Sequence, residues 1–155
     1  MGEIRSVLFV CLGNICRSPM AEAVFIEAAK QKGVANKWHA ESAGTAGYHV
    51  GCSPDERTIS VLRKNGIQFE HSAKQLVKED FYTFNFIFGM DKSNMDNINR
   101  IKPKDSKAQV LLLGSFDPEG DTIIRDPYYD NDNRGFEKCF QQCMRSCKSF
   151  LDKNK

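Results

Sequence analysis

The sequence predicts one α/β domain over residues 1–155, a three-layer sandwich in which a four-stranded parallel sheet has helices on both faces. Apolar runs rich in β-branched and aromatic residues, typical of buried strands, alternate along the chain with amphipathic helical patterns. The length of 155 residues suits one domain of ordinary size. No internal repeat, low-complexity tract or linker divides the chain.

The first strand and the first helix have the clearest patterns. Residues 6–11 form a continuous apolar run, which suits a strand buried on both faces of a parallel sheet. The helical pattern that follows predicts Ser18 as N-cap, Pro19 at the first helical position and Gly33 as the stop. The sequence therefore predicts a strand, a tight loop and a helix.

The later elements continue the alternation. We expect, in order, a second strand at 38–43, a helix from a capping box at 53–56 to about 65, a short helical stretch at 75–81, a third strand at 84–90, a helix capped by Asp91, a fourth strand at 108–113 and a final helix from about 135. Residues 115–134 are polar and without periodicity, and loops of this length in compact domains are usually functional or disordered.

Composition excludes several classes of protein. Twenty-two basic against twenty acidic residues leave a net charge of +2, which is too balanced to indicate a nucleic-acid partner or an electrostatic membrane anchor. No apolar stretch approaches the roughly 20 residues of a membrane span, and the run at 7–12 is too short for a signal-peptide core. We therefore expect a cytoplasmic protein with reduced thiols. Met1-Gly2 begins a loose N-myristoylation pattern that Glu3 disfavours.

The chain has six cysteines, which could serve thiol chemistry, disulfides or a metal site. They are Cys11, Cys16, Cys52, Cys139, Cys143 and Cys147. A reducing compartment disfavours a disulfide scaffold. The last three recur at every fourth residue on the apolar face of the final helix, and no second His or Cys cluster completes four zinc ligands. We expect these three to be core residues and the protein to hold no metal, while Cys52 has no assigned role.

The loop after the first strand is the strongest candidate for a functional site, because ligands of open α/β sheets bind at the carboxyl ends of the strands. In this loop Cys11 and Arg17 are separated by five residues, directly before a helix start. Gly13 and Asn14 tolerate left-handed backbone conformations. The loop N–H groups and the helix N-terminus can therefore converge on a tetrahedral oxyanion.

The spacing alone is weak evidence, since Cys139 and Arg145 repeat it inside a predicted helix, where the N–H groups are already bonded. In the first loop, backbone dipoles and a guanidinium favour the thiolate form of Cys11, which is a nucleophile. Arg17 offers a planar fork that matches two phosphate oxygens. Ser18 can donate a hydrogen bond to the sulfur, and the chemistry predicted is phosphoryl transfer through a phosphocysteine.

The segment Val10-Cys11-Leu-Gly-Asn-Ile-Cys16-Arg17-Ser18-Pro19 resembles the signature of the low-molecular-weight protein tyrosine phosphatase family. The likeness continues, in order, at residues 21–23, 42–45, 53–55, 78–81, 90–91, 93–94 and 126–129, across nearly the whole chain. It implies an enzyme that hydrolyses phosphotyrosine in proteins, and small aryl phosphates as an acid phosphatase, without cofactor or metal.

The resemblance assigns the general acid to Asp126, which precedes Pro127 in the long polar loop. One carboxyl group can protonate the leaving oxygen and later accept a proton from water. The resemblance also implies that Tyr128 and Tyr129 form a wall of the substrate pocket and can themselves be phosphorylated. It implies that Tyr48 forms the opposite wall. From the residues alone, Asp-Pro is equally a turn signal and the tyrosines are equally surface aromatics. The positions of Tyr48 and His49 vary in the family, so the peptide preference stays open.

The resemblance further implies support for the loop. The residues concerned are Leu12, Gly13, Asn14, Ile15, Cys16, Ser42 and His71, of which Ser42 and His71 are the implied hydrogen-bond partners of Asn14. From composition alone, His71 is a partly exposed loop histidine. Cys16 can form a reversible disulfide with Cys11 that protects the nucleophile from irreversible oxidation, or it is simply a small apolar residue of the loop.

Other functions stay open at this stage. An arsenate reductase on the same scaffold needs further redox cysteines after the third strand, and residues 81–107 contain none. A non-catalytic phosphotyrosine-binding module would not need Asp126, and a zinc-organised module would rest on the helical cysteines alone. The sequence does not identify a physiological substrate, and it leaves open whether the chain forms a weak homodimer.

Overall fold

The computed structural model describes residues 3–155, so the Met1-Gly2 pattern lies outside the described residues. The predicted four-stranded parallel sheet is confirmed, with strand order β2-β1-β3-β4. The elements are β1 Arg5–Cys11, α1 Arg17–Gln31, the 3-10 helix η1 Ala35–Lys37, β2 Trp38–Gly44, α2 Glu56–Lys64, α3 Asp80–Thr83, β3 Phe86–Gly89, α4 Lys92–Ile101, β4 Gln109–Leu112, the 3-10 helix η2 Leu113–Phe116 and α5 Arg134–Lys153.

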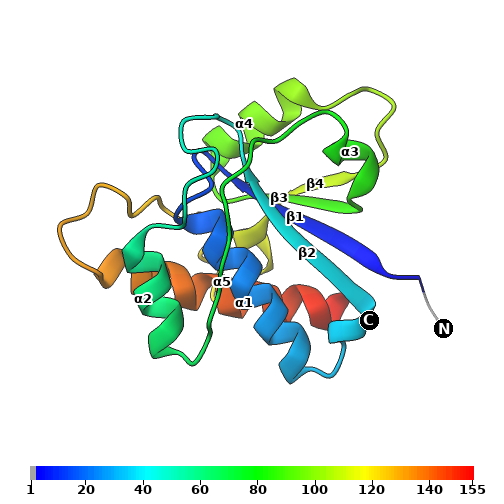
Figure 1. Ribbon diagram of the computed structural model, residues 1–155. Helices are drawn as coiled ribbons and strands as arrows, with labels where there is room; N and C mark the ends of the chain where they lie inside the picture. The colour runs from blue at the N-terminus through cyan, green and yellow to red at the C-terminus, as the bar shows by residue number, and fades with distance from the viewer. Residues whose placement is uncertain (1–2) are drawn as a thin grey trace.

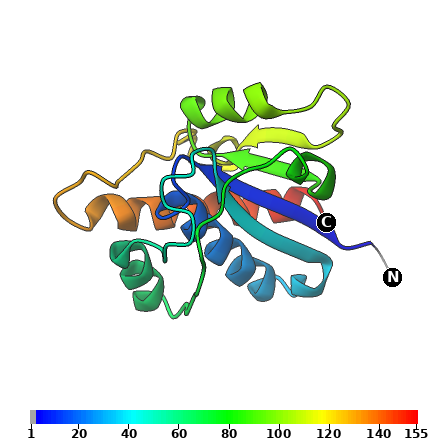
Figure 2. The same ribbon diagram turned by 45° about the horizontal axis from the view of Figure 1, so that its top comes forward.

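Helices cover both faces of the sheet, so the three-layer arrangement is also confirmed (Figures 1 and 2). Helices α1 and α5 lie side by side on one face, with α2 beside them, and α4 covers the other face together with the short α3. Strand β1 is central, and the chain passes from β2 on one side of it to β3 on the other. The loops that follow β1 and β3 therefore meet at the carboxyl edge of the sheet.

The larger core lies between the sheet and the α1–α5 layer. Phe150 of α5 is at its centre, with its ring centroid 5.0 Å from those of Phe86 and Phe88 and 5.2 Å from that of Phe116. The three cysteines of the same helix are buried in this core, as the helical spacing predicted. Within residues 3–155, no three His, Cys, Asp or Glu side chains gather as a metal cluster.

Two helix starts differ from the predictions. Helix α1 begins at Arg17 with Cys16 as N-cap, because the Ser18 side chain is directed instead towards the sulfur of Cys11. Helix α2 has Asp55 as N-cap, whose carboxylate accepts a hydrogen bond of 2.8 Å from the N–H of Arg57. The predicted capping box at 53–56 is therefore wrong, since Asp55, two residues after Ser53, caps the first turn itself.

The predicted helical stretch at 75–81 is wrong in its first half. The N–H of Leu76 donates to the carbonyl of Gly44 at 2.7 Å, and the N–H of Gly44 donates to the carbonyl of Lys74 at 2.9 Å. These bonds attach a short extended segment to the outer edge of β2. The backbone of residues 74–76 pairs with the free N–H and C=O groups of this edge strand instead of forming helical hydrogen bonds. Helical structure begins only at Asp80.

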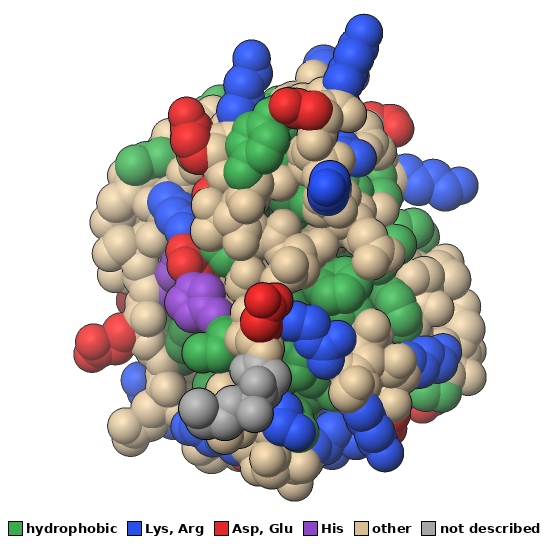
Figure 3. All heavy atoms as spheres, turned by 90° about the vertical axis from the view of Figure 1, so that its right-hand side faces the viewer, with side chains coloured by type: hydrophobic (Ala, Val, Ile, Leu, Met, Phe, Trp, Pro, Cys, Tyr) green, Lys and Arg blue, Asp and Glu red, His purple; other side chains and the backbone are tan. Residues whose placement is uncertain are grey.

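The end of the molecule opposite the carboxyl edge has a mixed surface. Figure 3 shows basic side chains projecting around this end, with acidic and hydrophobic side chains between them. Within residues 3–155, no helix combines the length and the apolar character that crossing a membrane would need.

The long polar segment after η2 is fastened to α5 by an ion pair. Arg145 donates to Asp117 through Nε at 2.9 Å and Nη2 at 3.0 Å, and the Asp117 side chain is fully buried. The hydrogen bonds from Arg145 hold the pKa of Asp117 below its ordinary value, although burial opposes the shift. The carboxylate is therefore the stable form in the folded protein.

Replacing Asp117 by Asn keeps the shape and removes the charge, so we expect a loss of about 2 kcal/mol of unfolding free energy at pH 7. Because the pKa of Asp117 is lower in the folded than in the unfolded chain, its contribution is present above about pH 4 and is lost as the pH falls through the folded pKa. Urea unfolding of the wild type and of Asp117→Asn at pH 7 and at pH 3 measures the difference in unfolding free energy at each pH. The exposed Asp152, paired with Lys32, provides the control variant Asp152→Asn, which should leave the unfolding free energy almost unchanged, because solvent screens an exposed ion pair. An Asp117→Asn deficit of equal size at both pH values would contradict this account.

Candidate active site

The candidate site is built on the β1–α1 loop, residues 12–16, at the carboxyl edge of the sheet. Cys11 is the last residue of the central strand and Arg17 is the first residue of α1. Both side chains are buried, at 3% exposure each. The strand end and the helix start thus fix the two ends of the loop independently of its own sequence.

The carbonyl groups of this loop are bonded outwards. The carbonyls of Cys11, Leu12 and Ile15 accept hydrogen bonds of 2.9, 2.9 and 2.8 Å from the N–H groups of Thr45, Ala46 and Asp55. A peptide N–H points away from its C=O, so this pattern turns the loop N–H groups inwards. Within residues 3–155, the N–H groups of Gly13, Ile15 and Cys16 donate to no protein acceptor. They form a ring of donors able to bind an anion.

Gly44, at the end of β2, allows the loop to lie this close. A Cβ at this position would be 2.7 Å from the carbonyl oxygen of Leu12 and 3.1 Å from the nitrogen of Asn14. Both neighbours are backbone atoms, which a side chain could not displace without moving the loop. Gly44 therefore contributes to the site because it has no side chain, which lets the loop approach the end of β2.

Asn14 holds the loop from within. Its φ is 58°, the left-handed region that Asn tolerates better than most residues. Its Oδ1 accepts hydrogen bonds from His71 Nε2 at 2.8 Å and from the N–H of Lys74 at 3.0 Å, while Nδ2 donates to Ser18 Oγ at 2.8 Å. One buried side chain therefore links the loop, α1 and the segment beside β2.

Ser42 is not a direct partner of Asn14, so that expectation is wrong. Its hydroxyl donates to Glu22 Oε1 at 2.6 Å and lies 3.3 Å from His71 Nε2. Ser42 therefore orients His71 from behind, together with Glu22, whose carboxylate lies 3.6 Å from His71 Nδ1. Sequence reasoning missed Glu22, although a carboxylate between two alanines on a buried helix is itself a signal.

The sulfur of Cys11 receives hydrogen bonds from two sides. The N–H of Asn14 donates to Sγ at 3.3 Å, and the hydroxyl of Ser18 lies 3.0 Å from Sγ. The single proton of the Ser18 hydroxyl has two acceptors within reach, the sulfur at 3.0 Å and the carbonyl of Ala43 at 3.3 Å, while Asn14 Nδ2 donates to the Ser18 oxygen. The sulfur thus lies against one N–H donor and one hydroxyl, an arrangement that suits a nucleophile.

Arg17 is oriented by residues that the sequence analysis did not assign to the site. Its Nη1 donates to Asp91 Oδ2 at 2.6 Å and to the carbonyl of Ile124 at 2.9 Å. Burial alone would lower the pKa of Arg17, but the charges of Cys11 and Asp91 raise it above its ordinary value. Asp91 was predicted only as the cap of α4, a role that is confirmed by its 2.8 Å bond from the N–H of Asn94. Its place directly after β3 was the missed signal.

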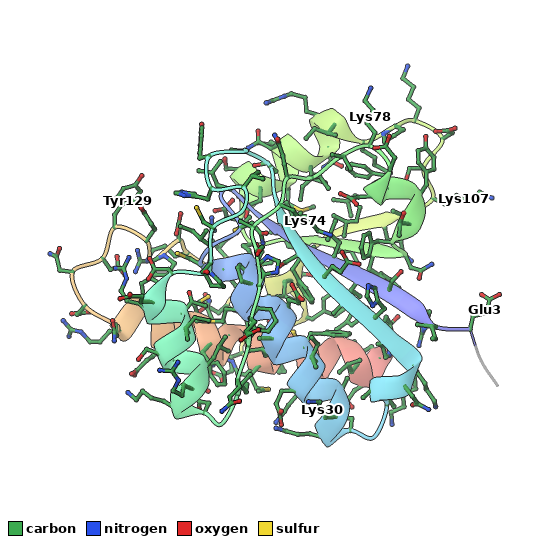
Figure 4. The ribbon with its side chains drawn as sticks, in the orientation of Figure 1. Glu3, Lys30, Lys74, Lys78, Lys107 and Tyr129 are labelled. Atoms are coloured by element: carbon green, nitrogen blue, oxygen red, sulfur yellow. The ribbon has the colours of Figure 1, made fainter. Side chains whose placement is uncertain are left out.

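A pocket of ≈ 110 Å³ opens above the sulfur. It is lined by Cys11, Leu12, Gly13, Ile15, Cys16, Arg17, Tyr48, His49, Asp126, Tyr128 and Tyr129. Every predicted site residue thus lines the pocket, except for Asn14, Ser18, Ser42 and His71. Asn14 belongs to the loop but its side chain is turned away from the pocket lining, and the other three lie in the network around it. Tyr48 and Tyr129 are exposed at the rim, and Figure 4 shows Tyr129 pointing outwards from the segment that precedes α5.

Asp126 and Cys16 complete the pocket. Asp126 Oδ1 accepts the N–H of Tyr128 at 3.1 Å, and Oδ2 lies 3.7 Å from Arg17 Nη2, so the carboxyl group stands at the rim beside the guanidinium. Cys16 is buried, and burial together with the charges of Asp55 and Asp126 raises the pKa of its thiol well above the ordinary value. Cys16 is therefore a neutral thiol next to the candidate nucleophile.

Proteins similar to this chain in sequence and in fold are known. Residues 6–155 match the family model described as low molecular weight phosphotyrosine protein phosphatase. The chain is 52% identical to the Mus musculus protein of that name, with 99% of each chain covered. It is 44% identical to the crystal structure of Primo-1, with a TM-score of 0.93 and 96% and 97% of the two chains covered. It is also similar to the crystal structure of a Drosophila arginine phosphatase, at 35% identity, a TM-score of 0.91 and the same coverage.

Replacing Asn14 by Ala removes its side-chain hydrogen bonds and places a less tolerant residue at positive φ. We expect binding of inorganic phosphate, measured by calorimetry, to weaken about tenfold, which corresponds to roughly 1.4 kcal/mol. Glycine tolerates the positive φ but has no side chain to form the hydrogen bonds. Asn14→Gly should therefore bind phosphate more tightly than Asn14→Ala and less tightly than the wild type. Asn99→Ala on the exposed side of α4 is the control. Unchanged phosphate affinity in Asn14→Ala would show that the network does not shape the anion site.

Proposed function

The chain belongs to the low molecular weight phosphotyrosine protein phosphatase family, and from this premise we propose that its tyrosine phosphatase reaction runs through a phosphocysteine on Cys11. The protein is a hydrolase of phosphate monoesters. The observation that best supports the proposed route is the sulfur at the floor of a pocket with inward N–H groups and a buried arginine. Such a site binds a phosphate and presents a nucleophile to its phosphorus atom.

In the first step, the Cys11 sulfur attacks phosphorus, the S–P bond forms and the bond to the leaving oxygen breaks. The loop N–H groups and Arg17 bind the non-bridging oxygens and stabilise their charge as it develops. Asp126, at the rim, gives its proton to the leaving oxygen, so that a neutral phenol departs. Asp91 and the Ile124 carbonyl fix Nη1 of Arg17, which leaves Nη2 on the pocket side.

In the second step, water attacks phosphorus and Asp126, now a carboxylate, accepts its proton. The S–P bond breaks, inorganic phosphate leaves and the electron pair returns to the sulfur. Ser18, 3.0 Å from Sγ, donates a hydrogen bond to this departing thiolate. Charge stabilisation comes from backbone dipoles and one guanidinium, so the proposed reaction needs no metal ion.

The aromatic rim supports phosphotyrosine as the substrate. The rings of Tyr128 and His49 contact each other at the pocket mouth, with 6.3 Å between their centroids, and Tyr48 and Tyr129 lie beyond them. A flat ring attached to the phosphate can pack against this aromatic surface, whereas a shorter phosphoserine would not reach it. Small aryl phosphates meet the same requirement, so the proposed activity extends to them as an acid phosphatase.

Cys16 supports a reversible redox control of the same site. A thiolate at Cys11 is oxidised by peroxide to a sulfenic acid, and attack by the Cys16 sulfur then forms a disulfide and releases water. The active enzyme requires free thiols, and all six cysteines are unpaired in the described structure. A cytoplasmic location provides the reducing conditions that keep them free.

We expect Cys11→Ser to abolish turnover of p-nitrophenyl phosphate and of phosphotyrosine peptide, and Asp126→Ala to lower it by about 10²–10⁴-fold, the typical contribution of a general acid. Matched phosphoserine and phosphoarginine peptides should be poor substrates, and EDTA should have no effect. Equal rates for wild type and Cys11→Ser would refute the covalent mechanism. Loss of activity in EDTA would refute the metal-free one.

Mild peroxide should produce a Cys11–Cys16 disulfide that dithiothreitol reverses with full recovery of activity. Mass spectrometry of peptides from the oxidised protein identifies the product. In Cys16→Ser the same treatment should inactivate irreversibly, with a Cys11 sulfinate as the product. Cys52→Ser, at an exposed cysteine outside the pocket, is the matched control. A Cys11 sulfinate as the main early product in wild type would falsify the redox proposal.

A further inference from the structure

The segment that presents Asp126 to the pocket is held by a residue from a distant part of the chain. This segment, residues 126–130, is called the acid loop below. Arg57, the second residue of α2, donates through Nη2 to the carbonyl of Tyr128 at 2.8 Å and through Nη1 to the carbonyl of Asp130 at 2.9 Å. Among residues 3–155, no residue of a helix or strand other than Arg57 forms a hydrogen bond to the acid loop.

The Arg57 guanidinium is itself fixed in place. Its Nε donates to Asp55 Oδ1 at 3.0 Å and its Nη2 donates to Asp55 Oδ2 at 3.0 Å. This two-point contact sets the plane of the guanidinium group. One face of this plane lies 4.4 Å from the ring centroid of Phe136 in α5. A flexible surface arginine would have neither restraint, so this side chain serves as a rigid support.

The same helix start is bonded to the nucleophile loop. The N–H of Asp55 donates to the carbonyl of Ile15 at 2.8 Å, and the buried hydroxyl of Thr58 donates to the carbonyl of Cys16 at 3.3 Å. The first turn of α2 therefore contacts the β1–α1 loop on one side and the acid loop on the other. A shift of this turn would move both loops, whereas loss of Arg57 alone would release only the acid loop.

A short path connects Arg57 to the carboxyl group of Asp126. Tyr128 is held by Arg57 at its carbonyl, and its N–H donates to Asp126 Oδ1 at 3.1 Å. The Tyr128 residue therefore lies between the arginine and the acid. The bond from Arg57 restrains the Tyr128 backbone at its carbonyl, and the N–H of the same residue, on the other side of its Cα, bonds the Asp126 carboxyl group.

We infer that Arg57 is a positioning residue for the general acid: it holds the acid loop at the height above Cys11 where Asp126 can protonate the leaving oxygen. The inference rests on the proposed role of Asp126. Arg57 does not line the pocket and contacts no reacting atom. Its effect should therefore appear only in steps that need the proton.

The test compares kcat/KM for two substrates, since this constant reports the first chemical step. Phenyl phosphate has a poor leaving group that needs a proton, and 2,4-dinitrophenyl phosphate has a good one that does not. We expect Arg57→Ala to lower kcat/KM about tenfold with phenyl phosphate and less than about twofold with the dinitrophenyl ester. In an Asp126→Ala background, adding Arg57→Ala should change neither value by more than about twofold.

Two further variants complete the series. Arg57→Lys keeps the charge but cannot span both carbonyls, so it should show the same leaving-group pattern and keeps the test valid if Arg57→Ala fails to fold. Arg63→Ala, exposed on the same helix, should leave both substrates unchanged. Equal losses on both substrates, or losses that add to those of Asp126→Ala, would overturn the inference. If Asp126→Ala itself showed no leaving-group dependence, the acid assignment would fail instead.

Discussion

The site depends on one constraint: the five-residue loop after the central strand must turn its N–H groups inwards and its carbonyls outwards. The carbonyls find their partners in the segment after β2 and in the start of α2, and Asn14 stabilises the left-handed residue that this turn requires. These partners come from two segments of the chain outside the loop, at residues 45–46 and at Asp55. The anion site is therefore a product of the whole carboxyl edge of the sheet, although its donors belong to one short loop.

The same edge explains how a nearly neutral protein can bind a dianion. A net charge of +2 gives no general attraction, but one buried arginine and several oriented dipoles act at short range around a buried sulfur. The arginine is in turn paired with Asp91, which holds Nη1 without occupying Nη2. Positive charge at the site is thus local and directed, and a second arginine, Arg57 of α2, bonds the segment that carries Asp126.

Much of this could be predicted from the sequence, because the signals are local. Apolar runs and helical periodicity gave the order of the elements, and the cysteine, glycine and arginine of the first loop indicated its chemistry. The predictions failed where tertiary contacts replaced local ones. Ser18 was predicted as a cap from its position before Pro19, yet its hydroxyl is used by Cys11. Residues 74–76 pair with the edge of β2 rather than forming a helix, and Ser42 contacts Glu22 rather than Asn14.

The sequence by itself determined the fold class, the candidate loop and the family resemblance, because each is the sum of short local signals: apolar runs, helical periodicity and motifs of a few residues. Only the tertiary structure decided how that loop is supported. Glu22, Arg57 and Asp91 act at the site through partners 20 to 74 residues away in the chain. No local pattern records such pairs, since a hydrogen bond depends on where two side chains meet in space, and packing of the sheet and helices sets that distance.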